Sequence, residues 1–179
     1  MHPSARYWPS PSPPFIPAAT PQPKDDPFYK YTDTKPLPDV LPGTVLKTRS
    51  FPYKIIGSIP TLLNVTQLLY RSTKPDPTGT PTVNVTSVIQ PRIQPNKTKV
   101  ISYQSAYDSL NQNHEPSYAL SGGVTLGGVV NNVEWAVFLP FLAEGYTIIV
   151  PDTEGQAADF ASGPEYGLNT LDSIRAAFS

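Results

Sequence analysis

The side chains that most often act as nucleophiles, bases and metal ligands are scarce in this sequence. It contains no cysteine, which excludes a thiol nucleophile, a disulfide framework, a thiolate zinc site and an iron–sulfur cluster. Its two histidines, His2 and His114, are too few for most histidine-based metal sites. His114 lies in the polar stretch 111–115, six residues beyond Asp108. A solvated loop histidine is expected there rather than a catalytic base.

Three carboxylates follow two short apolar runs. Asp108 comes after residues 100–103, and Asp152 and Glu154 come after residues 147–150. Acidic side chains at strand ends commonly accept hydrogen bonds from nearby backbone N–H groups and so shape turns. The residues alone favour this turn-forming role for all three carboxylates, because no partner histidine for acid–base work is identifiable.

Overall composition narrows the possible partners. The 13 Lys and Arg residues against 14 Asp and Glu residues give a net charge of -1, so no basic field attracts nucleic acid or anionic lipid headgroups. No run of about 18 apolar residues predicts a membrane span. The segment Ser121-Gly122-Gly123 lacks the flanking glycines and preceding strand of a phosphate loop, and it is interpreted as a flexible loop. No cofactor or metal is expected.

Proline divides the chain. More than half of the 23 prolines lie before residue 44. Because proline lacks an N–H and disfavours helix in its predecessor, residues 1–24 are predicted to form a disordered Pro-rich leader. Residues 25–179 are predicted to form one incomplete domain. The leader has no uninterrupted apolar core of about 7–15 residues, so it is not a signal peptide as written.

Segments rich in β-branched and aromatic residues predict strands at 45–51, 65–72 and 82–90. The turn at 74–79 predicts that the second and third of these strands pair antiparallel. The third alternates, with Val83, Val85 and Ile89 on one face and Thr82, Asn84 and Thr86 on the other. Residues 100–103 and 147–150 do not alternate, which is typical of strands covered on both faces.

Two helices are predicted after the meander. In the first, Trp135, Phe138, Leu139 and Leu142 recur at helical spacing, Gly145 fits a C-terminal cap, and Pro140 should kink the helix or mark a late start. The second has Ser162 with Glu165 as a capping box, and its apolar stripe comprises Leu168, Leu171, Ile174 and Phe178. Because such a stripe needs a following strand to bury it, Ser179 is expected to interrupt a domain.

The order of elements, antiparallel strands leading into strand–helix–strand–helix, resembles the N-terminal part of an α/β-hydrolase. More closely, the chain resembles the fungal secretory lipase family of the lipase A type, from about Asp25 to Phe178. The resemblance is carried by Asp25–Tyr29, Gln67–Thr73, Ser102–Gln104 with Asp108, Pro116–Tyr118, Gly145–Tyr146, Val150–Gly155 and Leu171–Ala176.

The resemblance implies an α/β fold, a parallel sheet with flanking helices, and hydrolysis of triacylglycerols and related lipid esters by a Ser-Asp-His triad. The family's serine lies in a G-x-S-x-G elbow after the next strand, and this sequence contains no such motif. The chain is therefore expected to stop before the nucleophile elbow and to be inactive alone. Its partners would be a lipid or ester substrate and, transiently, a lipid surface.

Asp108 matches the family position whose side chain helps to form the oxyanion hole, and with the resemblance this role is favoured over a turn. To donate a hydrogen bond to an oxyanion, the Asp108 carboxyl must be protonated.

The sequons Asn64-Val65-Thr66, Asn84-Val85-Thr86 and Asn96-Lys97-Thr98 are candidate N-glycosylation sites. Asn84 is expected on a solvated polar strand face and Asn96 in a turn. Secretion is implied by the resemblance. The alternative to a lipase is a non-catalytic secreted β-rich binding or surface module with a Pro-rich stalk.

Overall fold

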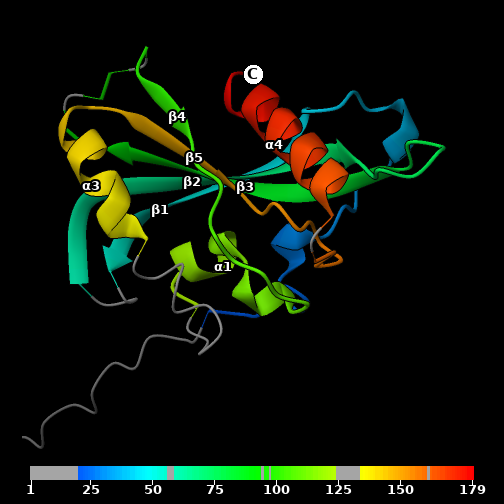
Figure 1. Ribbon diagram of the computed structural model, residues 1–179, viewed down its shortest axis with the longest axis horizontal. Coiled ribbons are helices and arrows are strands. Elements are labelled where there is room, and N and C mark those ends of the chain that lie inside the picture. The colour runs from blue at the N-terminus through cyan, green and yellow to red at the C-terminus, as the bar shows by residue number, and fades with distance from the viewer. Residues whose placement is uncertain (1–19, 56–58, 94, 97, 124–133, 161) are drawn as a thin grey trace, which may run out of the picture.

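The computed structural model describes residues 20–55, 59–93, 95–96, 98–123, 134–160 and 162–179 (Figure 1). Within these residues one mixed sheet of five strands has the order β1-β2-β3-β5-β4. The strands are β1 (Val45–Ile55), β2 (Ile59–Thr73), β3 (Pro81–Pro91), β4 (Val100–Ser102) and β5 (Thr147–Pro151). The helices are α1 (Pro116–Leu120), α3 (Trp135–Ala143) and α4 (Gly163–Ala177), with 3-10 turns η1 (Pro27–Tyr29), η2 (Leu37–Asp39) and η3 (Gln112–His114).

The first three strands form the predicted antiparallel meander. β1 pairs with β2 and β2 with β3, both antiparallel, and each strand extends beyond its predicted bounds. Between β2 and β3, the Asp76 side chain accepts the N–H groups of Thr78 at 2.9 Å and Thr80 at 3.1 Å. These bonds close the turn that was predicted at 74–79.

The last two strands convert the meander into an α/β sheet. β5 lies between β3 and β4, antiparallel to β3 and parallel to β4. The prediction that 147–150 is covered on both faces is confirmed, because every residue of β5 is buried. For 100–103 it is wrong, since β4 is half-buried at the edge of the sheet. Parallel pairing places the carboxyl ends of β4 and β5 side by side.

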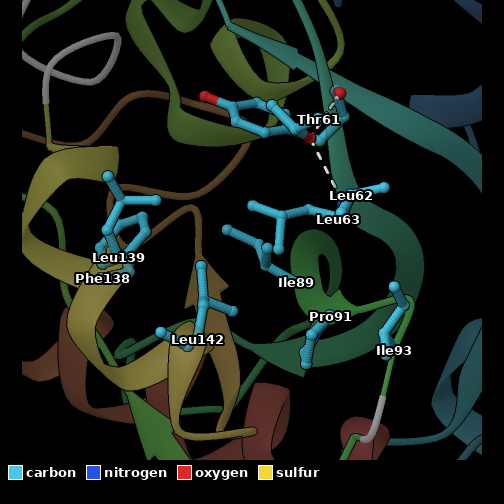
Figure 2. A pocket seen from close by; sticks show the side chains of 11 residues that line it. Thr61, Leu62, Leu63, Ile89, Pro91, Ile93, Phe138, Leu139 and Leu142 are labelled. Atoms are coloured by element: carbon cyan, nitrogen blue, oxygen red, sulfur yellow. Dashed lines mark hydrogen bonds between the residues drawn. The ribbon is translucent and has the colours of Figure 1, made fainter.

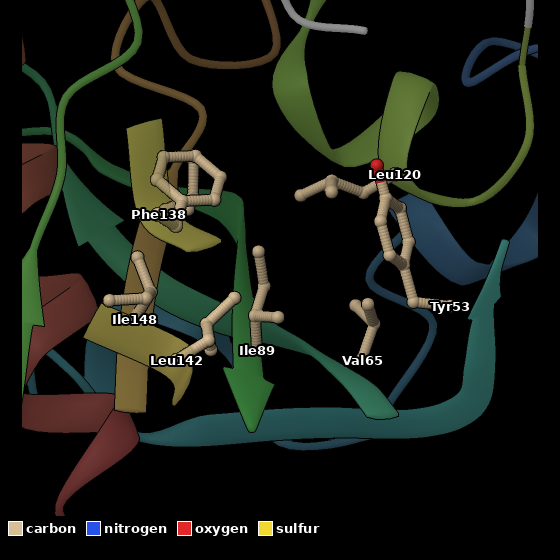
Figure 3. Close-up of a cluster of buried hydrophobic side chains, with 8 residues drawn as sticks. Tyr53, Val65, Ile89, Leu120, Phe138, Leu142 and Ile148 are labelled. Carbon is tan, nitrogen blue, oxygen red and sulfur yellow. The ribbon is translucent and has the colours of Figure 1, made fainter. Parts of the chain in front are cut away.

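The main hydrophobic core lies between the sheet and the pair α1 and α3 (Figure 3). Phe138 and Leu142 of α3 are 5% and 4% exposed, and they pack with Ile89 and Ile148 of the sheet. Leu139, predicted to share their stripe, is 41% exposed. α3 begins at Trp135 and contains Pro140, and Gly145, with φ of 85°, follows its C-cap as predicted.

Helix α4 covers the opposite face of the sheet and buries its polar side. Tyr70 Oη donates to the Asn169 carbonyl at 2.8 Å, and Ser72 Oγ donates to Asn169 Oδ1 at 2.7 Å. Of the predicted apolar stripe, Leu168 and Ile174 are half-buried, whereas Leu171 and Phe178 are 53% and 65% exposed. Under α4 the sheet presents the hydroxyls of Tyr70 and Ser72 beside the apolar side chains of Leu68 and Val88, so the buried side of the helix meets both polar and apolar groups. The Ser162 side chain makes no capping hydrogen bond.

The predicted leader lies mostly outside the described residues. Thr20, inside its predicted range, donates through its hydroxyl to the Ser121 carbonyl at 3.1 Å, 101 positions away. The boundary between residues 24 and 25 stays a prediction. In the part of the chain that the structure describes, no helix is long and apolar enough to cross a membrane.

Candidate active site

Asp108 lies in the loop that leaves β4, at the carboxyl end of the parallel strand pair. Open α/β sheets bind their ligands at this end of the strands. The Asp108 side chain is exposed, and the residues around it, from 103 to 111, form no regular secondary structure. Because an irregular loop cannot pair its backbone with itself, its N–H groups need acceptors elsewhere.

Glu134, the residue before α3, supplies the first of these acceptors. Its Oε1 accepts the Ala106 N–H at 2.9 Å and the Tyr103 hydroxyl at 3.2 Å, and its Oε2 accepts the Ser105 hydroxyl. Glu134 is 9% exposed. Its carboxylate therefore attaches the start of the loop to α3. The sequence carried no local signal for this contact, which joins residues 28 to 31 positions apart.

Glu154, in the turn after β5, supplies the second acceptor. Its carboxylate accepts the Ser109 N–H at 3.2 and 3.3 Å and the Tyr166 hydroxyl at 2.8 Å, and its own N–H donates to Tyr107 Oη at 3.1 Å. Burial raises the pKa of Glu154, whereas the hydrogen bonds from Tyr166 and Ser109 lower it. The prediction that this carboxylate accepts backbone N–H groups is confirmed.

His114 is held within the same loop. Its Nδ1 lies 2.6 Å from the Ser109 hydroxyl, and its Nε2 lies 3.4 Å from Asn111 Nδ2. The imidazole is half-buried rather than solvated, so the predicted environment is wrong. Both ring nitrogens contact groups of the loop itself, which is the arrangement of a histidine that stabilises local structure.

Asp152 belongs to a buried cluster beneath the loop. Its Oδ1 accepts the Ser117 N–H at 2.9 Å and its Oδ2 accepts the Ser117 hydroxyl at 2.5 Å, as the predicted backbone-binding role requires. Glu115 is fully buried and lies beside Asp152. Burial and the charge of Asp152 raise the pKa of Glu115. Burial also raises the pKa of Asp152, to about 6, although the Ser117 hydrogen bonds oppose this.

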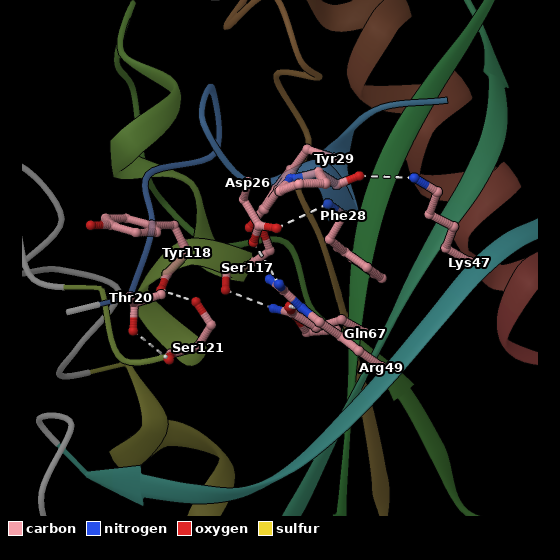
Figure 4. Close-up of polar contacts among 12 residues, drawn as sticks. Thr20, Asp26, Phe28, Tyr29, Lys47, Arg49, Gln67, Ser117, Tyr118 and Ser121 are labelled. Carbon is pink, nitrogen blue, oxygen red and sulfur yellow. Dashed lines mark hydrogen bonds and ion pairs between the residues drawn. The ribbon is translucent and has the colours of Figure 1, made fainter. Parts of the chain in front are cut away.

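A polar network connects Ser117 to the start of the domain (Figure 4). The Tyr29 hydroxyl lies 2.8 Å from Ser117 Oγ, and Gln67 Nε2 donates to the Ser117 carbonyl at 2.6 Å. Arg49 donates to Gln67 Oε1 at 2.7 Å and forms an ion pair with Asp26 at 2.5 Å. The Arg49 charge lowers the pKa of Asp152. Sequence reasoning did not find this network, because its members come from four separated segments.

The three sequons lie in different environments. Asn64 and Asn96 are exposed. The expectation that Asn84 is solvated is wrong, because Asn84 is 1% exposed and its Nδ2 donates to the Asp152 carbonyl at 2.6 Å and to Tyr70 Oη at 3.1 Å. The face of β3 that carries Asn84 is covered, so the folded chain leaves no room for a glycan at that nitrogen.

An apolar pocket of about 480 Å³ lies apart from this edge, between α3 and strands β2 and β3 (Figure 2). Its floor includes Ile89, which pairs with Ile148 at the start of β5, whereas Asp108 lies beyond the end of β4. Its lining carries no acidic or basic side chain. Among the described residues, no cluster of His, Cys, Asp and Glu could hold a metal ion. The loop around Asp108, which carries polar and acidic side chains, is therefore the better candidate for an active site than the apolar pocket.

Comparisons with known proteins show similarity to lipases. Residues 121–179 match the secretory lipase family. A probable inactive lipase of Mycobacterium tuberculosis is 38% identical over 159 residues, covering 88% of this chain and 35% of that protein. Lipase 5 of Candida albicans is 37% identical over 158 residues, covering 87% of this chain and 33% of that protein. The chain thus spans about a third of the length of these relatives.

A solved structure shows the same fold. The closed state of Candida antarctica lipase A superposes with a TM-score of 0.75 at 31% identity, covering 89% of this chain and 36% of that one. The mixed sheet with flanking helices is therefore the corresponding part of an α/β-hydrolase, as predicted. Fold, sequence identity and the matched C-terminal segment together place this chain in the secretory lipase family.

Proposed function

We propose that this chain forms the oxyanion-hole wall of a lipase domain that hydrolyses triacylglycerols and related lipid esters. The single observation that supports the assignment most is the position of Asp108. It lies in the loop after β4, at the carboxyl end of the parallel pair, and this loop is attached to the rest of the fold on both sides. Membership of the secretory lipase family supports ester hydrolysis as the reaction.

In this proposal, the protonated Asp108 carboxyl donates a hydrogen bond to the oxyanion of the tetrahedral intermediate, with a backbone N–H after the nucleophile as the second donor. The nucleophilic serine and the Asp and His that activate it are supplied by sequence outside these 179 residues. Leu110 and Phe160, which are 82% and 50% exposed and line one hollow beside the loop, would contact the lipid surface.

The test uses a chimera in which residues 20–179 replace the matched third of Candida antarctica lipase A. We expect the chimera to hydrolyse a p-nitrophenyl ester and to be inhibited by a serine-directed phosphonate. Asp108→Ala should lower kcat by about 10²–10³, the usual cost of one oxyanion donor. Asp108→Asn, whose amide can also donate, should retain most of the activity.

The matched control is Asp39→Ala, which removes an exposed aspartate far along the chain in η2. A folded, active chimera in which Asp108→Ala and Asp39→Ala behave alike would refute the role of Asp108. The 179-residue chain by itself should show negligible ester hydrolysis, because it has no nucleophile elbow. Phosphonate-sensitive turnover by the chain alone would contradict the proposal and its division of the active site.

Secretion is part of the proposal, and the exposed Asn64 and Asn96 are its proposed glycosylation sites. At Asn96, the side-chain oxygen accepts the Thr98 N–H at 3.0 Å and the Thr98 hydroxyl at 2.7 Å, which leaves the amide nitrogen free of these contacts. A non-catalytic secreted module remains the alternative. It would be favoured by a chimera that folds but shows no phosphonate-sensitive ester hydrolysis.

A further inference from the structure

We infer that Glu154 is a positioning residue for Asp108: its carboxylate holds the Ser109 backbone and its own N–H holds the Tyr107 side chain, and together these contacts set where the oxyanion-hole carboxyl lies. The inference rests on the proposed function of Asp108 and extends it to a residue in the turn after the neighbouring strand β5. It rests on the hydrogen bonds that Glu154 makes with Tyr107 and Ser109, the residues on either side of Asp108.

The first part of the argument is that Asp108 cannot position itself. Its side chain is exposed and its loop has no regular secondary structure. The location of its carboxyl therefore depends on the backbone of the two flanking residues. Tyr107 is 5% exposed and Ser109 is half-buried, so both neighbours lie against the body of the molecule while Asp108 points away from it.

The second part is that Glu154 contacts both neighbours. Its backbone N–H donates to Tyr107 Oη at 3.1 Å, and its carboxylate accepts the Ser109 N–H through both oxygens, at 3.2 and 3.3 Å. These three distances join the turn after β5 to the loop after β4. The carboxyl ends of two adjacent parallel strands are thereby linked at the one point where the proposed oxyanion donor emerges.

The third part is that Glu154 is itself immobilised. It is fully buried, and Tyr166 of α4 donates to its Oε1 at 2.8 Å. The side chain spans three elements, namely the β5 turn, the β4 loop and α4. A rigid acceptor of this kind is what a catalytic group on an irregular loop needs, because a misplacement of about 1 Å can cost about 10²-fold in rate.

The consequence is a specific pattern of kinetic effects. Oxyanion contacts strengthen in the transition state, so loosening the donor lowers kcat and leaves KM nearly unchanged. In the chimera we expect Glu154→Ala to lower kcat by about 10²-fold. In the Asp108→Ala background the same change should have less than about a threefold effect, because the group it positions is gone. A merely structural role would lower activity equally in both backgrounds.

A second measurement uses the chimera and needs no catalytic activity. Glu154→Ala should raise the exchange rate of the Ser109 amide proton by about tenfold or more in NMR hydrogen exchange, because its acceptor is removed. Glu154→Gln keeps one acceptor oxygen and should give a smaller increase, with the fold intact. The matched control is Glu144→Ala, which removes an exposed glutamate after α3 and should leave Ser109 unchanged.

The two measurements separate the possible failures. Unchanged Ser109 exchange in both Glu154 variants overturns the inference whatever the activity of the chimera. Faster exchange together with a chimera insensitive to Asp108→Ala overturns the proposed function of Asp108. It would then establish only the hydrogen bond between Glu154 and the Ser109 N–H. Additive kinetic losses in the double variant overturn the positioning role, even where exchange is faster.

Discussion

At the scale of single residues, the carboxylates after the strands differ in burial, although each of them follows a short apolar run in the sequence. Asp108 is exposed, whereas Asp152 and Glu154 have no exposed surface. Their position after a strand was predictable from local spacing, and so was the acceptance of backbone N–H groups by Asp152 and Glu154. Glu115 was not predicted, because its burial against Asp152 depends on how distant segments pack.

The buried acids make stability depend on pH. Folding raises the pKa of Asp152 from an ordinary value of 3.8 to about 6, and it raises that of Glu115 as well. The unfolded chain then loses these protons at lower pH than the folded chain does. Stability is therefore highest below about pH 4 for these two groups, and it falls as pH rises toward and through about 6.

We expect Glu115→Gln to weaken this dependence, because it removes one buried group that ionises. Urea unfolding at pH 4 and pH 7 should show similar midpoints at pH 4 and a higher midpoint for the variant at pH 7. Glu144→Gln, at an exposed position, is the control and should follow the wild type at both pH values. Identical pH profiles for wild type and Glu115→Gln would show that Glu115 does not titrate as its burial requires.

At the scale of elements, periodicity located the helices and strands better than it identified their buried faces. All five predicted strands and both predicted helices are present in the described residues. In α3, however, Leu139 is exposed while Phe138 and Leu142 are buried. In α4 the polar side is buried. A helix made almost entirely of apolar residues has no polar face to indicate which side meets the sheet, and the polar groups under α4 come from β2.

The packing of α3 gives a test at this scale. Phe138→Ala should lower the free energy of unfolding by about 3–5 kcal/mol, because it opens a cavity in the main core. Leu139→Ala, one position along the same helix, should cost less than about 1 kcal/mol because its side chain is 41% exposed. Denaturant unfolding measures both, and similar losses at the two positions would contradict the orientation of α3.

At the scale of the whole molecule, the described residues expose an edge strand and apolar side chains of the kind found at protein–protein interfaces. β4 lies at the edge of the sheet, and in the described chain it pairs with β5 alone. The outer face of α4 carries Leu171 and Phe178, which are 53% and 65% exposed. Unpaired strand edges and contiguous apolar surface both favour association.

We therefore expect the isolated chain to self-associate at micromolar concentration, as light scattering after size exclusion would show. The double variant Leu171→Lys, Phe178→Lys should shift the population toward monomer, because it places charge on the apolar face of α4. Val137→Lys, at an exposed position of α3 on the opposite face of the sheet, is the control and should leave association unchanged. A wild-type monomer with a sharp cooperative thermal transition would count against this expectation.

The positions of the strands, turns and helices could be predicted from the amino-acid sequence, because they depend on residue spacing over a few positions and on turn-forming side chains such as Asp76. The resemblance to secretory lipases, and hence the role proposed for Asp108, also came from the sequence. Three features became visible in the folded chain alone: Glu154 contacts both neighbours of Asp108, Glu115 lies buried beside Asp152, and Asn84 is covered. These contacts join residues far apart in the chain, so they follow from strand order and helix crossing, which local spacing does not encode.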